Sequence, residues 1–64
     1  MNLYLCNDKK TFNQKIYAKS HLDALNKFKK LHGVEIKMVL RIECANYREY
    51  FAPDHIYSIS IFQQ

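Results

Sequence analysis

Residues 34–44 alternate between apolar and mostly charged side chains at every step. The apolar positions are Val34, Ile36, Met38, Leu40, Ile42 and Cys44. The intervening positions are Glu35, Lys37, Val39, Arg41 and Glu43. Successive side chains of a strand point to opposite faces, whereas a helix would scatter these residues around its circumference. The pattern therefore predicts a long β-strand with one face in the core and the other toward solvent.

The segment before this strand has a helical period instead. Its apolar residues at helical spacing are Leu22, Leu25, Phe28 and Leu31, with Ala24 beside them. Ser20 is a favourable N-cap, and Asp23 follows three residues later as an acidic variant of the capping box. Gly33, the only glycine, stands where a left-handed residue commonly ends a helix. We expect an amphipathic helix over residues 21–32.

The two ends of the chain predict further strands. We expect residues 1–6 and 12–19 to form a hairpin around a polar turn. Its apolar face, which Gln14 interrupts, holds Met1, Leu3, Leu5, Phe12, Ile16 and Ala18. Residues 56–62 predict a last strand whose core-facing side chains are Tyr57, Ile59 and Ile61. This strand has no formal charge, so we expect it to be central in the sheet or paired with a partner. Residues 45–55 fit either a hairpin extension or a helical turn.

The expected fold class is therefore α+β, with the order β-β-α-β-β in a single domain of residues 1–64. One amphipathic helix would pack on one face of a four-stranded, mainly antiparallel sheet. The other face would be open, because one helix can cover only one side. The side chains expected on that open face are Tyr4, Lys15, Tyr17, Lys37, Val39 and Arg41.

The length and the cysteine content limit the class of protein. A chain of 64 residues can bury only about 60% of its unfolded surface, so its core is small. Cys6 and Cys44 are too few for a secreted disulfide scaffold. We expect two buried thiols in a reducing cytoplasm, with a single bridge as the alternative. The sequence shows no signal-peptide pattern and no apolar stretch of the ~20 residues that a membrane span needs.

The charge is concentrated in the first half of the chain. The formal net charge is +4, and residues 1–33 hold seven lysines against Asp8 and Asp23, whereas residues 34–64 are slightly acidic. A basic half is typical either of a soluble, lysine-coated surface or of a chain that meets an acidic partner.

No motif indicates a metal, a cofactor or catalysis. His21 and His32 would lie about 16 Å apart along the helix, too far to share one ion. A lone glycine cannot form a phosphate-binding loop. Cys44 continues the apolar face of its strand, which favours core packing over a nucleophilic role. We therefore expect no cofactor and no enzymatic activity.

One segment resembles a known group of proteins. The run from Ile16 through Ser20, then Asp23-Ala24-Leu25 and the strand over residues 35–42 are similar to a stretch of small phage and mobile-element accessory proteins, among them the phage inhibitor of bacterial RNA polymerase. The resemblance covers residues 16–42 and implies a phage-derived protein that binds a host complex. It assigns no functional residues.

These observations predict two functions. The first is a small non-enzymatic accessory protein that binds and modulates or inhibits a host protein complex. Its expected contact residues are Tyr17, Lys27, Lys30, Lys37 and Arg41. The alternative is a single-stranded nucleic-acid-binding protein, in which bases stack on tyrosines and cations meet phosphates. Its expected residues are Tyr4, Lys15, Tyr17 and Arg41. The small core and the uncharged last strand also make a homodimer an alternative to a monomer.

Overall fold

The chain folds as one helix on a five-stranded antiparallel sheet. The computed structural model describes residues 1–64. Its elements are β1 (Asn2–Asn7), β2 (Gln14–Ala18), α1 (His21–Leu31), β3 (Val39–Cys44), β4 (Tyr47–Ala52) and β5 (Tyr57–Gln63). The strand order is β2-β1-β5-β4-β3, and every neighbouring pair is antiparallel. The α+β class is as predicted. The sheet has five strands and not four, because residues 45–55 contain β4: the hairpin alternative is the correct one.

The helix begins and ends where its capping residues predict. The Asp23 amide donates to Ser20 Oγ at 3.1 Å, and Asp23 Oδ2 accepts from the Lys19 amide at 2.9 Å. At the other end, Gly33 has a φ of +67°, and the Val34 amide donates to the Lys29 carbonyl at 2.8 Å. This bond across a left-handed glycine is the Schellman arrangement. It stops α1 at Leu31, one residue before the predicted end.

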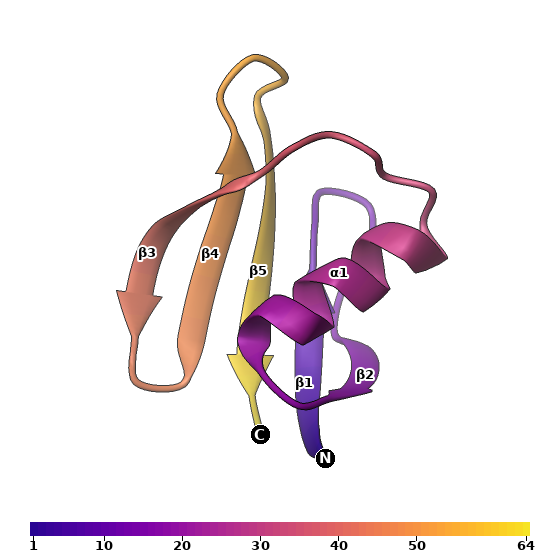
Figure 1. The fold of residues 1–64 in the computed structure, drawn as a ribbon, viewed down its shortest axis with the longest axis vertical. Coiled ribbons are helices and arrows are strands. Elements are labelled where there is room, and N and C mark those ends of the chain that lie inside the picture. Colours follow the sequence, from indigo (N-terminus) through magenta and orange to yellow (C-terminus); the bar gives the residue numbers. More distant parts are fainter.

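The strand after the helix is shorter than its alternation predicts. Residues 34–38 form no regular element, and only Val39–Cys44 pair with β4. The reason lies in the strand order, which places β3 at the edge of the sheet farthest from β2. Three strand spacings of about 4.8 Å separate β1, under the helix, from β3. Five extended residues reach about 17 Å, so this segment serves as the connection over the top of the sheet (Figure 1).

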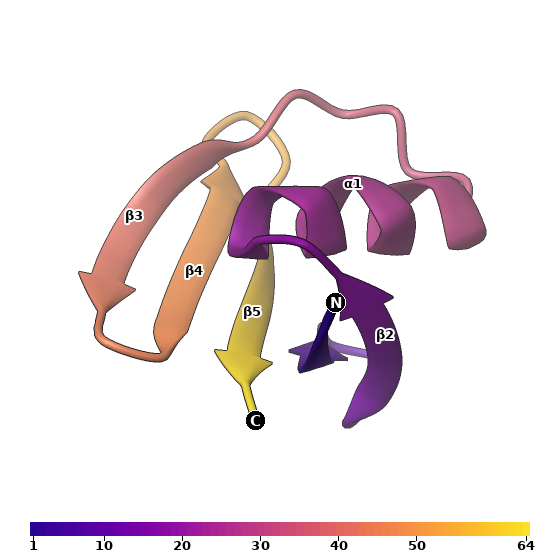
Figure 2. The same ribbon diagram turned by 60° about the horizontal axis from the view of Figure 1, so that its bottom comes forward.

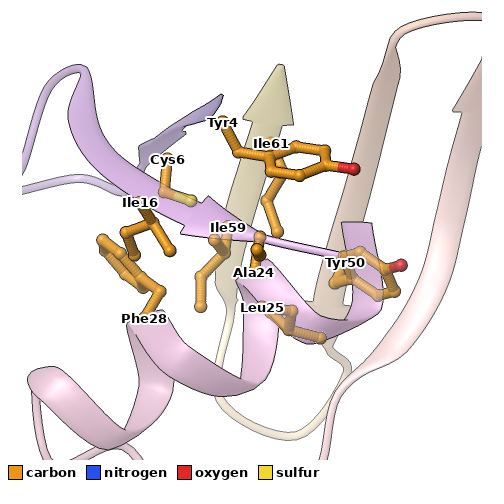
Figure 3. Packing of buried hydrophobic residues seen from close by; sticks show 10 residues of the cluster. Tyr4, Cys6, Ile16, Ala24, Leu25, Phe28, Tyr50, Ile59 and Ile61 are labelled. Carbon is orange, nitrogen blue, oxygen red and sulfur yellow. The ribbon is translucent and has the colours of Figure 1, made fainter. Parts of the chain in front are cut away.

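The core lies between α1 and the strands β2, β1 and β5, with one contribution from β4 (Figure 3). Its ten buried residues are Tyr4, Cys6, Ile16, Ala18, Ala24, Leu25, Phe28, Tyr50, Ile59 and Ile61. Figure 2 shows the helix lying across one face of the sheet, with β3 extending beyond it. Ile16, Ala18, Ile59 and Ile61 occupy the core as predicted. Leu22, Leu31, Met1 and Phe12 do not, since all four are exposed.

The face of β1 that the sequence pattern predicts to be buried is the wrong one. Tyr4 and Cys6 point toward the helix, and they are 1% and 0% exposed. Tyr4 pairs with Ile16 of β2, and its ring meets the edge of the His21 ring at 4.9 Å between centroids. Because side chains alternate, burying Tyr4 puts Leu3 and Leu5 on the opposite face. The expectation that Tyr4 lies on the open face is therefore wrong.

The two cysteines are free, and only one of them is buried. Burial raises the pKa of the Cys6 thiol to about 11, so this thiol stays protonated at neutral pH. Cys44 is exposed at the end of β3, and the prediction that it packs in the core is wrong. No bridge joins the two residues, which belong to strands at different places in the sheet.

The uncharged last strand is central in the sheet. β5 pairs with β1 on one side and with β4 on the other. Both of its edges are therefore satisfied within the chain, and the expectation of a central position is confirmed. α1, the one helix of the fold, is too short and too polar to cross a membrane.

Candidate binding surface

One face of the sheet has no element packed on it. α1 contacts β2, β1 and β5 from one side, and nothing covers the other side (Figure 2). We call this other side the open face. Strand register and alternation place there Leu3, Leu5, Lys15, Tyr17, Val39, Arg41, Ile42, Cys44, Tyr47, Glu49, Phe51, Ser58, Ser60 and Phe62.

Near one end of the open face, a row of apolar side chains crosses the sheet. Phe62 of β5 is opposite Leu5 of β1 and Tyr47 of β4. The Tyr47 and Phe62 rings are 4.6 Å apart. Next along the strands, Leu3 of β1 is opposite Tyr17 of β2. We call these five residues the Phe62 patch. Phe62 is still 44% exposed and Tyr17 60% exposed, so the patch presents aromatic surface to solvent.

A second apolar group lies at the other end of the open face. Phe51 of β4 is opposite Val39 of β3, and the guanidinium of Arg41 lies 4.9 Å from the centre of the Phe51 ring. A hollow of about 200 Å³ adjoins Phe51 and Arg41 and is bounded by Pro53, Ile56 and Tyr57. Ile56 is 93% exposed. We call Val39, Phe51 and Ile56 the Phe51 patch.

A band of polar groups separates the two patches. Glu49 of β4 accepts a hydrogen bond from the Tyr47 hydroxyl at 3.0 Å and lies 3.8 Å from Arg41. Arg41 lies on the open face by alternation with Val39. The register of β3 then shifts between Leu40 and Ile42, and this bulge turns Ile42 and Cys44 to the open face as well. Glu49 and Arg41 of this band are thus paired with each other. The apolar patches on either side remain uncovered.

The structure does not bring together the five predicted partner-contact residues. Tyr17 and Arg41 do lie on the open face, but on β2 and β3, its two edge strands, about 19 Å apart at four strand spacings. Lys27 and Lys30 are on α1, behind the sheet. Lys27 Nζ donates to the Tyr17 carbonyl at 2.8 Å and so is engaged within the fold. Lys37 lies in the connection before β3 and not on the sheet.

The residues of the nucleic-acid alternative are also dispersed. Tyr4 is in the core and cannot stack on a base. Lys15 and Tyr17 are close together on β2, both exposed and both on the open face. Arg41 stands at the opposite edge, where it is paired with Glu49. No three His, Cys, Asp or Glu side chains converge in a way that could hold a metal ion.

The sequence predicted only a small part of the open face. Phe62, Phe51 and Ile42 were not among the candidates, nor were Leu3 and Leu5. One signal was present: residues 3–6 are all apolar. A strand that is apolar at every position is suited to burial on both faces, which indicates that its second face does not simply meet water.

The comparisons with known proteins give no relative for this chain: no family model, no curated protein and no solved structure matches it. The geometry of the open face is thus the basis for a functional proposal.

Proposed function

We propose that this chain is a non-enzymatic accessory protein of the phage or mobile-element type, which docks its open face on a larger host protein or complex in the cytoplasm and thereby modulates or inhibits it. The observation that carries the proposal is the exposed aromatic and aliphatic surface of the Phe62 and Phe51 patches. Contiguous exposed apolar surface with a polar boundary is typical of protein-interaction sites.

The chemistry of the surface supports a protein partner. Aromatic side chains and arginine are the residues that most often dominate protein interfaces, and Phe62, Tyr17 and Arg41 are all partly or largely exposed. The two longer dimensions of the molecule, 31 and 24 Å, enclose roughly 740 Å². A standard interface buries about 800 Å² on each partner. This area is slightly below the standard value, so a stable complex would have to use nearly all of the open face.

The experiment compares capture of a host partner by variants of the two candidate surfaces. Val39→Thr keeps a β-branched residue on the open face while removing apolar area from the Phe51 patch, and Phe62→Ser removes the centre of the Phe62 patch. Lys30→Gln changes the exposed surface of α1 instead. We expect at least tenfold weaker capture of a stoichiometric partner for both open-face variants and unchanged capture for Lys30→Gln. Thermal unfolding of each variant checks that it remains folded.

Two results would contradict this proposal. Loss of capture in Lys30→Gln alone would move the contact to α1, and recovery of no stoichiometric partner from the host lysate would argue against protein binding altogether. Sedimentation of the free chain shows whether the open face is occupied by a second copy of this chain or is left free for a different protein.

Nucleic-acid binding is supported by one observation, the exposed pair Lys15 and Tyr17 on β2. Its test is a salt titration of binding to labelled single-stranded DNA and RNA. Binding through phosphate contacts weakens steeply as salt rises, and binding that also falls with Tyr17→Ala would favour this function. The protein-binding proposal expects no such binding at low salt.

A further inference from the structure

A second hollow lies where the β1–β2 turn meets the segment that follows α1. Its volume is about 220 Å³. Residues 8–11 of the turn form one wall, His32 and Val34 form another, and Tyr57 of β5 closes it. We call it the turn pocket. Three segments that are distant in the sequence therefore contribute to one concave site.

Hydrogen bonds to the carboxylate of Asp8 connect the residues around the turn pocket. Asp8 Oδ1 accepts hydrogen bonds from the amides of Lys10 and Thr11, both at 2.8 Å. Its Oδ2 accepts from the Tyr57 hydroxyl at 2.8 Å. A carboxylate has about four acceptor positions, so three of the four are taken by the protein itself. Asp8 fixes the turn and ties it to β5, and it has little capacity left for a ligand.

The remaining polar groups of the turn pocket are hydrogen-bond donors. They are the ammonium groups of Lys9 and Lys10, the imidazole of His32 and the hydroxyl of Thr11. The salt bridges of the molecule join Lys27 to Asp23, Arg41 to Glu49 and Arg48 to Glu43, and so use none of these groups. Two lysines against one aspartate leave the site with an excess of positive charge.

The neighbouring helix terminus does not prevent an anion from binding. The C-terminal end of a helix carries a partial negative charge on its free carbonyls. Here the carbonyls of Lys29 and Lys30 already accept hydrogen bonds from the amides of Val34 and Gly33, at 2.8 and 3.4 Å. The C-capping segment thus satisfies these carbonyls and places the His32 side chain beside the pocket.

We propose that the turn pocket binds a compact oxyanion, the phosphate group of a small phosphorylated ligand. Pockets for drug-sized molecules usually measure about 300–1,000 Å³, so a hollow of about 220 Å³ suits a single charged group better than a whole cofactor. Lysine ammonium groups bind phosphate as point charges, and the Thr11 hydroxyl adds a directional donor. Tyr57 lines both this site and the hollow beside the Phe51 patch, but the donors of the turn pocket come from other elements. The phosphate proposal is therefore independent of the protein-binding proposal.

The test is a titration of the full ¹⁵N-labelled chain with inorganic phosphate at constant ionic strength, followed by amide chemical shifts. We expect saturable shifts confined to residues 8–11, 32–34 and 57. The double variant Lys9→Gln/Lys10→Gln should bind at least tenfold more weakly. The matched control Lys15→Gln/Lys19→Gln, which removes the same charge from β2 and its end, should stay within twofold of the unmodified chain.

A second variant keeps the test independent of net charge. Thr11→Val is nearly isosteric, and the Thr11 hydroxyl makes no hydrogen bond within the protein, so the fold should be unaffected while phosphate binds severalfold more weakly. Shifts spread over all lysines, or equal weakening in both double variants, would overturn the assignment. A further titration with a single-stranded oligonucleotide at equal phosphate concentration shows whether the bound phosphate group belongs to a small ligand or to a nucleic acid. Tighter binding of the oligonucleotide, with shifts extending to Tyr17, would replace the small-ligand site by a nucleic-acid surface.

Discussion

The hydrogen bonds around Asp8 favour its ionised form. Partial burial on its own raises the pKa of this carboxyl. The bonds from the Lys10 amide, the Tyr57 hydroxyl and the Thr11 amide outweigh that effect, and the pKa of Asp8 lies below its ordinary value. On the other side of the same contact, burial and then the bond to Asp8 raise the pKa of Tyr57. Both shifts keep the carboxylate charged and the phenol protonated at neutral pH, which is the arrangement that the hydrogen bond requires.

Tyr57→Phe should therefore destabilise the fold at neutral pH. A hydrogen bond to a charged group contributes about 1.5 kcal/mol or more, and this one joins the β1–β2 turn to β5 across 49 positions of the chain. We expect a loss of about 1.5 kcal/mol in the free energy of unfolding, measured by urea denaturation at pH 7. Tyr17→Phe is the matched control, because no hydrogen bond involves the Tyr17 hydroxyl, and it should change stability by less than about 0.5 kcal/mol.

The same pair predicts the direction of the pH dependence. Because the folded-state pKa of Asp8 is lowered, its contribution is fully present above the ordinary aspartate pKa of about 3.9. It is lost as the pH falls through the lowered folded-state value. The stability difference between the unmodified chain and Tyr57→Phe should be constant near pH 7 and shrink below about pH 4. A difference that stays the same at acid pH would show that the Tyr57 hydroxyl does not act through ionised Asp8.

At the level of single residues, the sequence does not determine which face of β1 is buried. Leu3, Tyr4, Leu5 and Cys6 are all apolar, so the alternation is satisfied by either choice. A shift of one residue exchanges the two faces completely. The choice depends on tertiary partners, namely Ile16 opposite Tyr4 and the His21 ring against it, and those partners are known only once the sheet and the helix are assembled.

Among the elements, the turn between β4 and β5 contains a strained residue. Ile56 has a φ of +46°, a left-handed conformation that is unfavourable for β-branched residues. It is 93% exposed, so it gains almost nothing from burial in return. Residues held in such conformations are often found at binding sites, and Ile56 bounds the hollow beside the Phe51 patch.

Ile56→Asn should stabilise the free protein and weaken its complex. Asparagine tolerates the left-handed region, so we expect a gain of about 1 kcal/mol in the free energy of unfolding. Partner capture should fall, because an exposed apolar side chain of the Phe51 patch is lost. His55→Asn, at the exposed neighbouring position, should change neither quantity. A decrease in stability for Ile56→Asn would mean that the turn holds this conformation without strain.

The elements themselves differ in how well the sequence predicts them. The ends of α1 are set by local chemistry at Ser20, Asp23 and Gly33, and they were predicted within one residue. The length of β3 is set by how far the chain must travel across the sheet, which no local pattern contains. Likewise β4 buries only Tyr50 and Ala52, so its alternation is too weak to separate a strand from a helical turn.

In the molecule as a whole, the helix covers only part of the sheet. α1 packs on β2, β1 and β5, whereas β3 pairs with β4 alone and all six of its residues are exposed. The sequence could place Tyr17 and Arg41 on the open face, because both belong to alternating patterns. It could not reveal the Phe62 and Phe51 patches, since these depend on which strands become neighbours.

This uneven coverage predicts uneven local stability. Backbone segments with few buried contacts open at a lower free energy than the core. We therefore expect the paired amides of β3 to exchange with solvent at least tenfold faster than those of β5, which corresponds to about 1.4 kcal/mol. Hydrogen exchange followed by NMR on the free chain measures both strands in one experiment, with α1 as an internal reference for a covered element.

The same measurement bears on what the open face does. If a host protein docks there, its addition should slow exchange in β3 and in the open-face strands while leaving the outer surface of α1 unchanged. Exchange in β3 as slow as in β5 in the free chain would contradict the prediction. It would mean that the β3 edge is already paired in solution, and a concentration-dependent sedimentation coefficient would then identify the pairing strand as that of a second copy.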